Sequence, residues 1–152
     1  MDVTAELRAD CSVERLFAEL EDLASYPAWL GIVPRAVPLD DAAAWSVDLR
    51  GRLGPLARSK RLRMVRTVHD APTHCRFERR EHDGKRHSPW VLDVRVSADG
   101  ATGSTLLMSL HYGGSFGGAL LERMLGDEIE RSRPALLERL AESAPSDPSP
   151  TD

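Results

Sequence analysis

Residues 113–117, Gly-Gly-Ser-Phe-Gly, are the clearest catalytic motif in the chain, because they fit the pattern G-x-S-x-G. That pattern places the nucleophilic serine of α/β-hydrolases on a sharp turn between a strand and a helix. Such a hydrolase also needs a histidine after the serine, and the last histidine here is His111. We therefore expect the glycines to permit a turn and Ser115 to cap a helix.

Two histidines, His82 and His87, lie on either side of an Asp-Gly turn signal, and His74 precedes them. A zinc site needs three or four converging ligands. The neighbouring Lys85 and Arg86 oppose a bound cation. We therefore predict surface histidines, with no metal and no cofactor.

Arg79 and Glu81 share strand parity with Phe77, so an unbroken strand would point all three inward. An inward Arg–Glu pair can orient a polar group of a ligand, or shift the pKa of the glutamate for acid–base work. A structural ion pair, or a bulge that turns both residues to solvent, explains the same spacing, and we favour this interpretation. Arg58 and Lys60 share parity with inward positions of the preceding strand and raise the same question.

The elements that would position these side chains begin with a strand and a helix near the N-terminus. Loose alternation predicts a first strand over residues 3–11, and Ser12 is suited to cap the helix that follows. Pro27 should end or kink that helix, and the apolar residues 26–30 predict a short second helix or turn. The residues that recur at helical spacing are Val13, Leu16, Phe17, Leu20 and Leu23.

Alternation of apolar and polar residues from Ala44 to Tyr112 predicts five or six antiparallel strands, each half solvated. One strand is expected to present Trp45, Val47, Leu49 and Leu53 on a single face. The dipeptides Asp83-Gly84 and Asp99-Gly100 predict hairpins, while Gly54-Pro55 and Ala71-Pro72 predict turns.

Helical spacing returns from Gly118 onward and predicts a long closing helix, which Pro134 should kink or divide into two pieces. Residues 143–152 are polar and proline-rich, so we expect a disordered tail. The predicted organisation is therefore one domain over residues 1–142, followed by the tail over residues 143–152.

The composition suits one globular domain, because 152 residues with 41% hydrophobic content can bury a core. No apolar run reaches about 18 residues, so we expect no membrane span. The N-terminus lacks a basic region followed by an apolar stretch, which predicts no secretory signal. We expect Cys11 and Cys75 to be reduced, with Cys75 buried in a strand, and we infer a cytoplasmic location by default.

Charge is unevenly distributed along the chain. Residues 50–95 carry a net charge of +8, whereas residues 1–49 carry −7 and residues 96–152 carry −5. A basic sheet face could attract an anionic ligand, a membrane or a nucleic acid. The pattern is also explained by basic strands that pair with acidic neighbours in the same domain, and we favour this explanation. Nucleic acid is therefore not an expected partner.

The order of strand, helix with short second helix, strand run and long closing helix resembles the START-like helix-grip superfamily, also called SRPBCC. Residues 12–17 (Ser-Val-Glu-Arg-Leu-Phe) and residues 26–29 (Tyr-Pro-Ala-Trp) are similar to its polyketide cyclase/dehydrase and coenzyme Q-binding-like branch. The resemblance covers roughly residues 2–142. It implies an α+β helix-grip fold, with a curved antiparallel sheet wrapped around the long C-terminal helix and an elongated cavity between them.

Members of that superfamily bind sterols, lipids, quinones, aromatic polyketides or plant hormones, and some catalyse cyclisation or dehydration. The resemblance carries over no catalytic set, because the superfamily has no universal one. Residues 58–66 and 77–81 are more charged than a lipid cavity would be. This departure argues for a ligand that is not wholly apolar.

We expect a small cytoplasmic protein that binds a hydrophobic or amphipathic small molecule, such as a lipid, a quinone or a polyketide-like compound. One alternative is an aromatase/cyclase-type enzyme with Glu81 or Tyr112 in proton transfer, and another is a protein-interaction module that uses the basic sheet face. Every apolar residue of the expected cavity also suits an ordinary core. The residues expected to line the cavity are Leu49, Leu62, Met64, Phe77, Arg79, Glu81, Trp90, Leu92, Met108, Leu110, Tyr112, Leu121, Met124 and Leu125.

Overall fold

Alternating side chains along most of the chain build one antiparallel sheet, on which helices pack. The computed structural model describes residues 1–40, 43–52, 57–114 and 118–142, and those residues form seven strands, two α-helices and the short 3₁₀ helix η1. In chain order the elements are β1 (Asp2–Ala9), α1 (Val13–Leu20), η1 (Leu23–Ala28), β2 (Arg35–Pro38), β3 (Ala44–Leu49), β4 (Lys60–Asp70), β5 (His74–Arg79), β6 (Trp90–Asp99), β7 (Gly103–Tyr112) and α2 (Gly118–Glu142).

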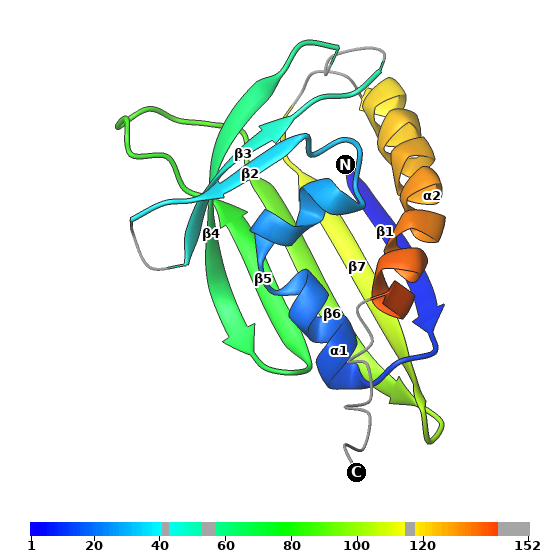
Figure 1. Cartoon of the computed structure of the whole chain (residues 1–152). Helices are drawn as coiled ribbons and strands as arrows, with labels where there is room; N and C mark the ends of the chain where they lie inside the picture. The colour runs from blue at the N-terminus through cyan, green and yellow to red at the C-terminus, as the bar shows by residue number, and fades with distance from the viewer. Residues whose placement is uncertain (41–42, 53–56, 115–117, 143–152) are drawn as a thin grey trace.

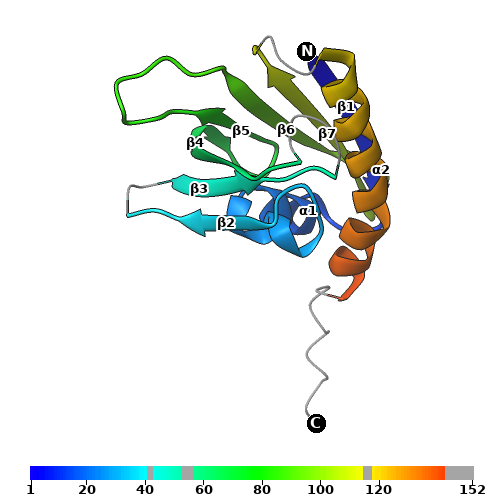
Figure 2. The ribbon, with the colours of Figure 1, turned by 90° about the horizontal axis from the view of Figure 1, so that it is seen from above.

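The sheet has the strand order β1-β7-β6-β5-β4-β3-β2, so the first strand pairs with the last (Figure 1). Asp2 lies opposite His111 at one end of the β1–β7 pair, and Ala9 lies opposite Ser104 at the other. The sheet curves from β2 around to β1, and α2 runs along the β1 and β7 side (Figure 2). This arrangement confirms the α+β helix-grip fold.

Local signals explain how the first helical segment begins and turns. Ser12 caps α1, because its Oγ accepts a hydrogen bond of 3.1 Å from the backbone N–H of Arg15. Asp22 caps η1 in the same way, accepting from the backbone N–H of Ala24 at 2.9 Å. The predicted second helix therefore exists, and it begins at Leu23, before the predicted residues 26–30.

Both predicted hairpins form, one through a tight turn and the other through a long loop. Residues 100–102 join β6 to β7, with Asp99 opposite Gly103 and Gly100 at a φ of 73° that favours glycine. At Asp83-Gly84, however, β5 has already ended and residues 80–89 form a loop. Asp83 accepts from the backbone N–H of Lys85 and turns the chain locally, while Pro89 has no N–H with which to extend the ladder before β6.

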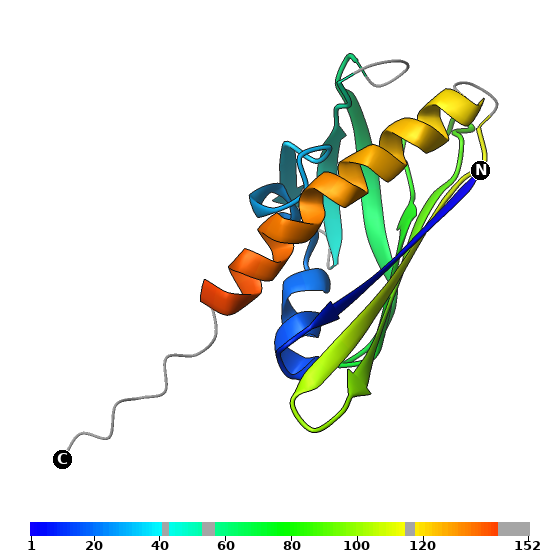
Figure 3. The same cartoon turned by 90° about the vertical axis from the view of Figure 1, so that its right-hand side faces the viewer.

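Helix α2 continues through Pro134, so the predicted division into two pieces is wrong (Figure 3). Tertiary packing offsets the loss of one backbone donor, because Leu136 and Leu140 beyond the proline are buried at 3% exposure each. The predictions for Leu53, Gly54-Pro55, Ser115 and the tail over residues 143–152 lie outside the described residues.

A single apolar core fills the concave side of the sheet. Phe77 is fully buried at its centre, with the ring of Tyr26 at 6.4 Å and the ring of Trp45 at 5.6 Å between centroids. Both cysteines are free thiols, and Cys75 is buried as expected.

The outer face of the sheet carries the basic residues together with acidic partners. Arg61 of β4 pairs with Asp48 of β3 at 2.8 Å, and Asp93 of β6 pairs with Arg76 at 3.1 Å and with Arg95 at 3.3 Å. This confirms that basic strands pair with acidic neighbours in the same sheet. Among the described residues, no helix is both long and apolar enough to cross a membrane.

Candidate functional site

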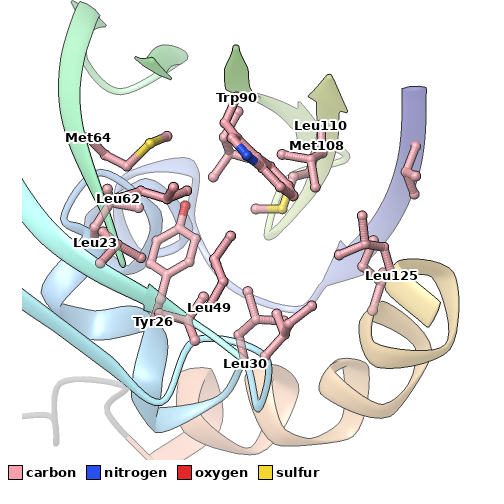
Figure 4. Close-up of a pocket in the computed structure, with 16 residues that line it drawn as sticks. Leu23, Tyr26, Leu30, Leu49, Leu62, Met64, Trp90, Met108, Leu110 and Leu125 are labelled. Atoms are coloured by element: carbon pink, nitrogen blue, oxygen red, sulfur yellow. The ribbon is translucent and has the colours of Figure 1, made fainter. Parts of the chain in front are cut away.

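A cavity of about 90 Å³ lies between the concave face of the sheet and the helices (Figure 4). Strands β1, β3, β4, β6 and β7 supply most of its wall, while α2, η1 and the segment after η1 close it. The residues that line it are Val3, Leu23, Tyr26, Leu30, Ile32, Val33, Val47, Leu49, Leu62, Met64, Trp90, Leu92, Met108, Leu110, Leu125 and Ile129.

Strand pairing brings the sheet residues of this wall together. Leu92 of β6 lies directly opposite Leu110 of β7, and Val47 of β3 lies directly opposite Leu62 of β4. Residues directly opposite one another in an antiparallel pair project to the same face, so the period of two along each strand repeats across the sheet. The wall therefore extends from β3 to β7 except at β5, where the rings of Tyr26 and Trp45 cover Phe77.

Two of the lining side chains carry a hydrogen-bonding group. The hydroxyl of Tyr26 donates to the carbonyl oxygen of Leu20 at 2.9 Å, and burial raises the pKa of Tyr26 so that it stays neutral. The Nε1 of Trp90 is buried and has no hydrogen-bond partner among the described residues. A buried donor without a partner costs about 1–3 kcal/mol. Figure 4 shows the Trp90 indole across the open space from Leu30 and Leu49.

A second cavity of about 40 Å³ adjoins the first, because Leu30, Met108 and Ile129 line both. Trp29 also lines the second cavity, and its Nε1 is likewise buried without a partner in the described structure. The two spaces follow one another along α2, separated by flexible aliphatic and thioether side chains. A ligand longer than the first cavity would reach the second by displacing them.

The chain matches the family model described as "Polyketide cyclase / dehydrase and lipid transport" over residues 1–144. It belongs to that family. Among solved structures, a protein from Thermus thermophilus is 18% identical with a TM-score of 0.74, and the match covers 95% of this chain and 99% of that one. A START superfamily protein from Mycobacterium smegmatis is 14% identical with a TM-score of 0.70, covering 93% and 97%. Curated proteins give no significant match.

These structural matches confirm the START-like fold, and at such low identity they show the fold alone. The family description names polyketides and lipids for the family as a whole, and it does not identify the ligand of this chain. The ligand of this family member must therefore be argued from its own residues.

The expected lining residues of this polyketide cyclase/dehydrase-family chain fall into two groups. Part of the set borders the cavity, and the rest packs beside it. Phe77, Leu121, Met124 and Tyr112 are buried in the core next to the cavity, with the Tyr112 ring 4.6 Å from that of Trp90. The residues that border the cavity as expected are Leu49, Leu62, Met64, Trp90, Leu92, Met108, Leu110 and Leu125.

Arg79 and Glu81 do not line the cavity. Arg79 Nε lies 3.6 Å from Glu81 Oε1, and Arg79 Nη1 donates to the carbonyl oxygen of Ser88 at 3.3 Å. Glu81 Oε1 also accepts from the backbone N–H of Arg63 at 2.6 Å. Their side chains are only 8% and 17% exposed, so no bulge turns them to solvent, and the pair lies on the inner side of the sheet at the end of β5.

Several wall residues were not expected from the sequence. Val47 shares strand parity with Leu49, and Tyr26 and Leu30 lie in an apolar segment, so local pattern could have found these three. Val3 and Ile129 lie in predicted elements, but they reach the cavity only because β1 pairs with β7 and α2 packs beside them, which no local pattern encodes.

The histidines of this chain form no metal centre in the described part of the structure, where no group of three or more His, Cys, Asp or Glu side chains converges. His82 and His87 are exposed, as expected. His87 Nε2 lies 2.7 Å from Asp83, and His74 Nε2 lies 2.7 Å from Asp93.

Proposed function

We propose that this protein binds a hydrophobic or amphipathic small molecule, such as a lipid, a quinone or a polyketide-like compound, in the cavity between the sheet and α2. The observation that carries the proposal is the unpartnered indole N–H of Trp90 in an otherwise apolar wall. A ligand oxygen at that position would satisfy the donor, while the apolar wall would bury the rest of the molecule at about 25 cal/mol per Å².

The size of the cavity limits what binds without rearrangement. A cavity of about 150 Å³ holds a benzene ring in an apolar core, so about 90 Å³ suits only a smaller group. Met64 and Met108 line the wall, and unbranched methionine side chains change rotamer at low cost. We expect ring-sized ligands to bind after these side chains move.

The test follows the indole N–H of Trp90 by NMR in protein labelled with ¹⁵N-tryptophan. The chain has three tryptophans, so three indole signals can be assigned by single substitutions to Phe. The matched ligands are 2-acetylnaphthalene, which carries a carbonyl acceptor, and 2-isopropylnaphthalene, in which a methyl group takes the place of the carbonyl oxygen. The ketone should shift the Trp90 signal saturably and bind about tenfold more tightly, the worth of one hydrogen bond.

Two variants serve as test and control. Trp90→Phe removes the donor from the cavity and should abolish the preference for the ketone. Trp45→Phe removes an indole N–H that donates to Asp22 at 2.9 Å outside the cavity wall, and should leave the preference intact. If a broad panel of lipids, ketones and polyketide mimics produces no saturable shift, the proposal is wrong.

The two alternative functions, an aromatase/cyclase-type enzyme and a protein-interaction module, have less support. Glu81 and Tyr112, the candidate proton-transfer groups of a cyclase, do not border the cavity. The basic outer face of the sheet, which an interaction module would use, carries arginines paired with Asp48 and Asp93.

Native mass spectrometry of the purified protein would reveal a co-purifying small molecule and give its class.

A further inference from the structure

Two tryptophan side chains carry buried hydrogen-bond donors that the described part of the protein leaves without a partner. Trp90 lines the first cavity and Trp29 lines the second, and the Nε1 of each is buried and unpartnered. The third tryptophan, Trp45, lines neither cavity, and its Nε1 donates to Asp22 at 2.9 Å. The two unpartnered indoles are therefore the two that line cavities.

Burial of these two N–H groups is unfavourable for the empty protein. A buried donor without a partner costs about 1–3 kcal/mol, and the large majority of buried side-chain donors in folded proteins have a partner. An apolar side chain would pack at either position without this cost. The two donors therefore indicate that their acceptors come from outside the chain.

The other polar side chains that line the second cavity already bond within the protein or face solvent. Ser132 Oγ donates to a backbone carbonyl oxygen of the preceding turn of α2 at 2.6 Å. Arg133 Nε donates to a glutamate of the same helix at 3.1 Å, and Glu6 is exposed. The indole N–H of Trp29 is therefore the donor in this cavity whose burial a ligand would compensate.

One ligand can reach both donors, because the two cavities adjoin. Leu30, Met108 and Ile129 line both spaces, and the unbranched Met108 side chain changes rotamer at low cost. No charged side chain is among the described residues that line the first cavity. An uncharged oxygen therefore suits Trp90 better than a carboxylate, which would be buried without an opposite charge.

We propose that the ligand is an elongated, uncharged molecule with an acceptor oxygen toward each end, such as a diketone, and that it spans both cavities. One oxygen accepts from the indole N–H of Trp90 and the other from that of Trp29, while the apolar part between them passes Met108. This inference rests on the binding proposed above and adds the number and the placement of the ligand's polar groups.

The test compares straight-chain diketones with monoketones of equal length in protein labelled with ¹⁵N-tryptophan. Heptane-2,6-dione, nonane-2,8-dione and undecane-2,10-dione place two carbonyl oxygens at increasing separations, and heptan-2-one, nonan-2-one and undecan-2-one carry one oxygen each. The diketone whose spacing matches the two donors should shift the indole signals of Trp29 and Trp90 together, with one saturation curve. These shifts are read in the unmodified protein, so they do not depend on the folding of a variant.

Trp29→Phe removes the second donor and tests its energetic contribution. The ratio of the diketone affinity to the monoketone affinity should fall about tenfold in this variant, the worth of one hydrogen bond. Trp45→Phe is the matched control, because it removes an indole N–H outside both cavity walls, and it should leave the ratio unchanged. The thermal midpoints of both variants establish that they are folded.

The possible failures are distinguishable. If 2-acetylnaphthalene or the diketones shift the Trp90 signal but no diketone shifts that of Trp29, the second contact is wrong while the cavity proposal stands. The same conclusion follows if Trp29→Phe and Trp45→Phe have equal affinity ratios. If no ketone of either kind produces a saturable shift, both proposals fail.

Discussion

The carboxylate of Glu19 in α1 accepts a hydrogen bond from Nε of Arg139 in α2, which joins two residues 120 positions apart in the chain. Glu19 also pairs with Arg15 at 3.3 Å, and its side chain is only 7% exposed. The ion pair holds the last turns of α2 against α1. It therefore fixes the far end of the helix that covers the cavity.

Replacing Arg139 with alanine should destabilise the protein by about 2 kcal/mol, because the buried carboxylate of Glu19 would lose one of its two charged donors. Urea unfolding followed by circular dichroism measures this change. Arg123→Ala, at an exposed position of the same helix, should change the free energy of unfolding by less than about 0.5 kcal/mol. Equal effects of the two substitutions would contradict the role given to the ion pair.

Met108→Ala should join the two cavities, since Met108 lines both. The lost side chain should lower the free energy of unfolding by about 2 kcal/mol or more. The larger space should favour 2-acetylanthracene, which is one ring longer than 2-acetylnaphthalene. The ratio of the affinity for 2-acetylanthracene to the affinity for 2-acetylnaphthalene should therefore rise about tenfold over that of the unmodified protein. Leu107→Ala removes an exposed neighbour that points away from the cavity and is the control. An unchanged affinity ratio in Met108→Ala would show that the two spaces do not connect.

The two cysteines should react at very different rates. Burial raises the pKa of the Cys75 thiol to about 12, whereas Cys11 is half-buried. Since the thiolate is the reactive form, iodoacetamide at pH 8 should modify Cys11 in the native protein and spare Cys75. Both should react in 6 M guanidinium. Mass spectrometry of the alkylated peptides gives the two rates, and comparable native rates would be inconsistent with the buried position of Cys75.

Asp93 should make the protein sensitive to acid. Burial raises the pKa of Asp93, but hydrogen bonds from His74 and Arg76 outweigh burial and hold that pKa below its ordinary value. A carboxylate with a lowered folded-state pKa contributes stability above about pH 4, the ordinary value for aspartate, and this is lost as the pH falls further.

Asp93→Asn should therefore lower the free energy of unfolding by about 1–2 kcal/mol at pH 7 and have little effect at pH 2. Urea unfolding at a series of pH values measures both. Asp127→Asn, at an exposed position of α2, is the control and should follow the unmodified protein at every pH. A constant difference between Asp93→Asn and the unmodified protein from pH 7 to pH 2 would refute the explanation.

Local pattern was enough to predict much of the fold. The period of two puts Trp90 and Leu92 of β6 on one face with Leu110 of β7, because side-chain direction along a strand depends only on the backbone. Ser12 caps α1 by a hydrogen bond within the first turn of that helix, so the neighbouring residues are enough to predict it. Where local signals failed, a distant contact decided: α2 passes through Pro134 because buried leucines beyond it hold the helix in place.

The sequence alone determined which residues face inward, and the tertiary structure decided which inward residues border empty space. Phe77 and Leu92 lie directly opposite one another on the same face, yet only Leu92 lines the cavity. The rings of Tyr26 and Trp45 fill the space in front of Phe77, whereas none of the described side chains around Leu92 fills the space in front of it. A cavity depends on the distance between elements far apart in the chain, and no local period encodes that distance.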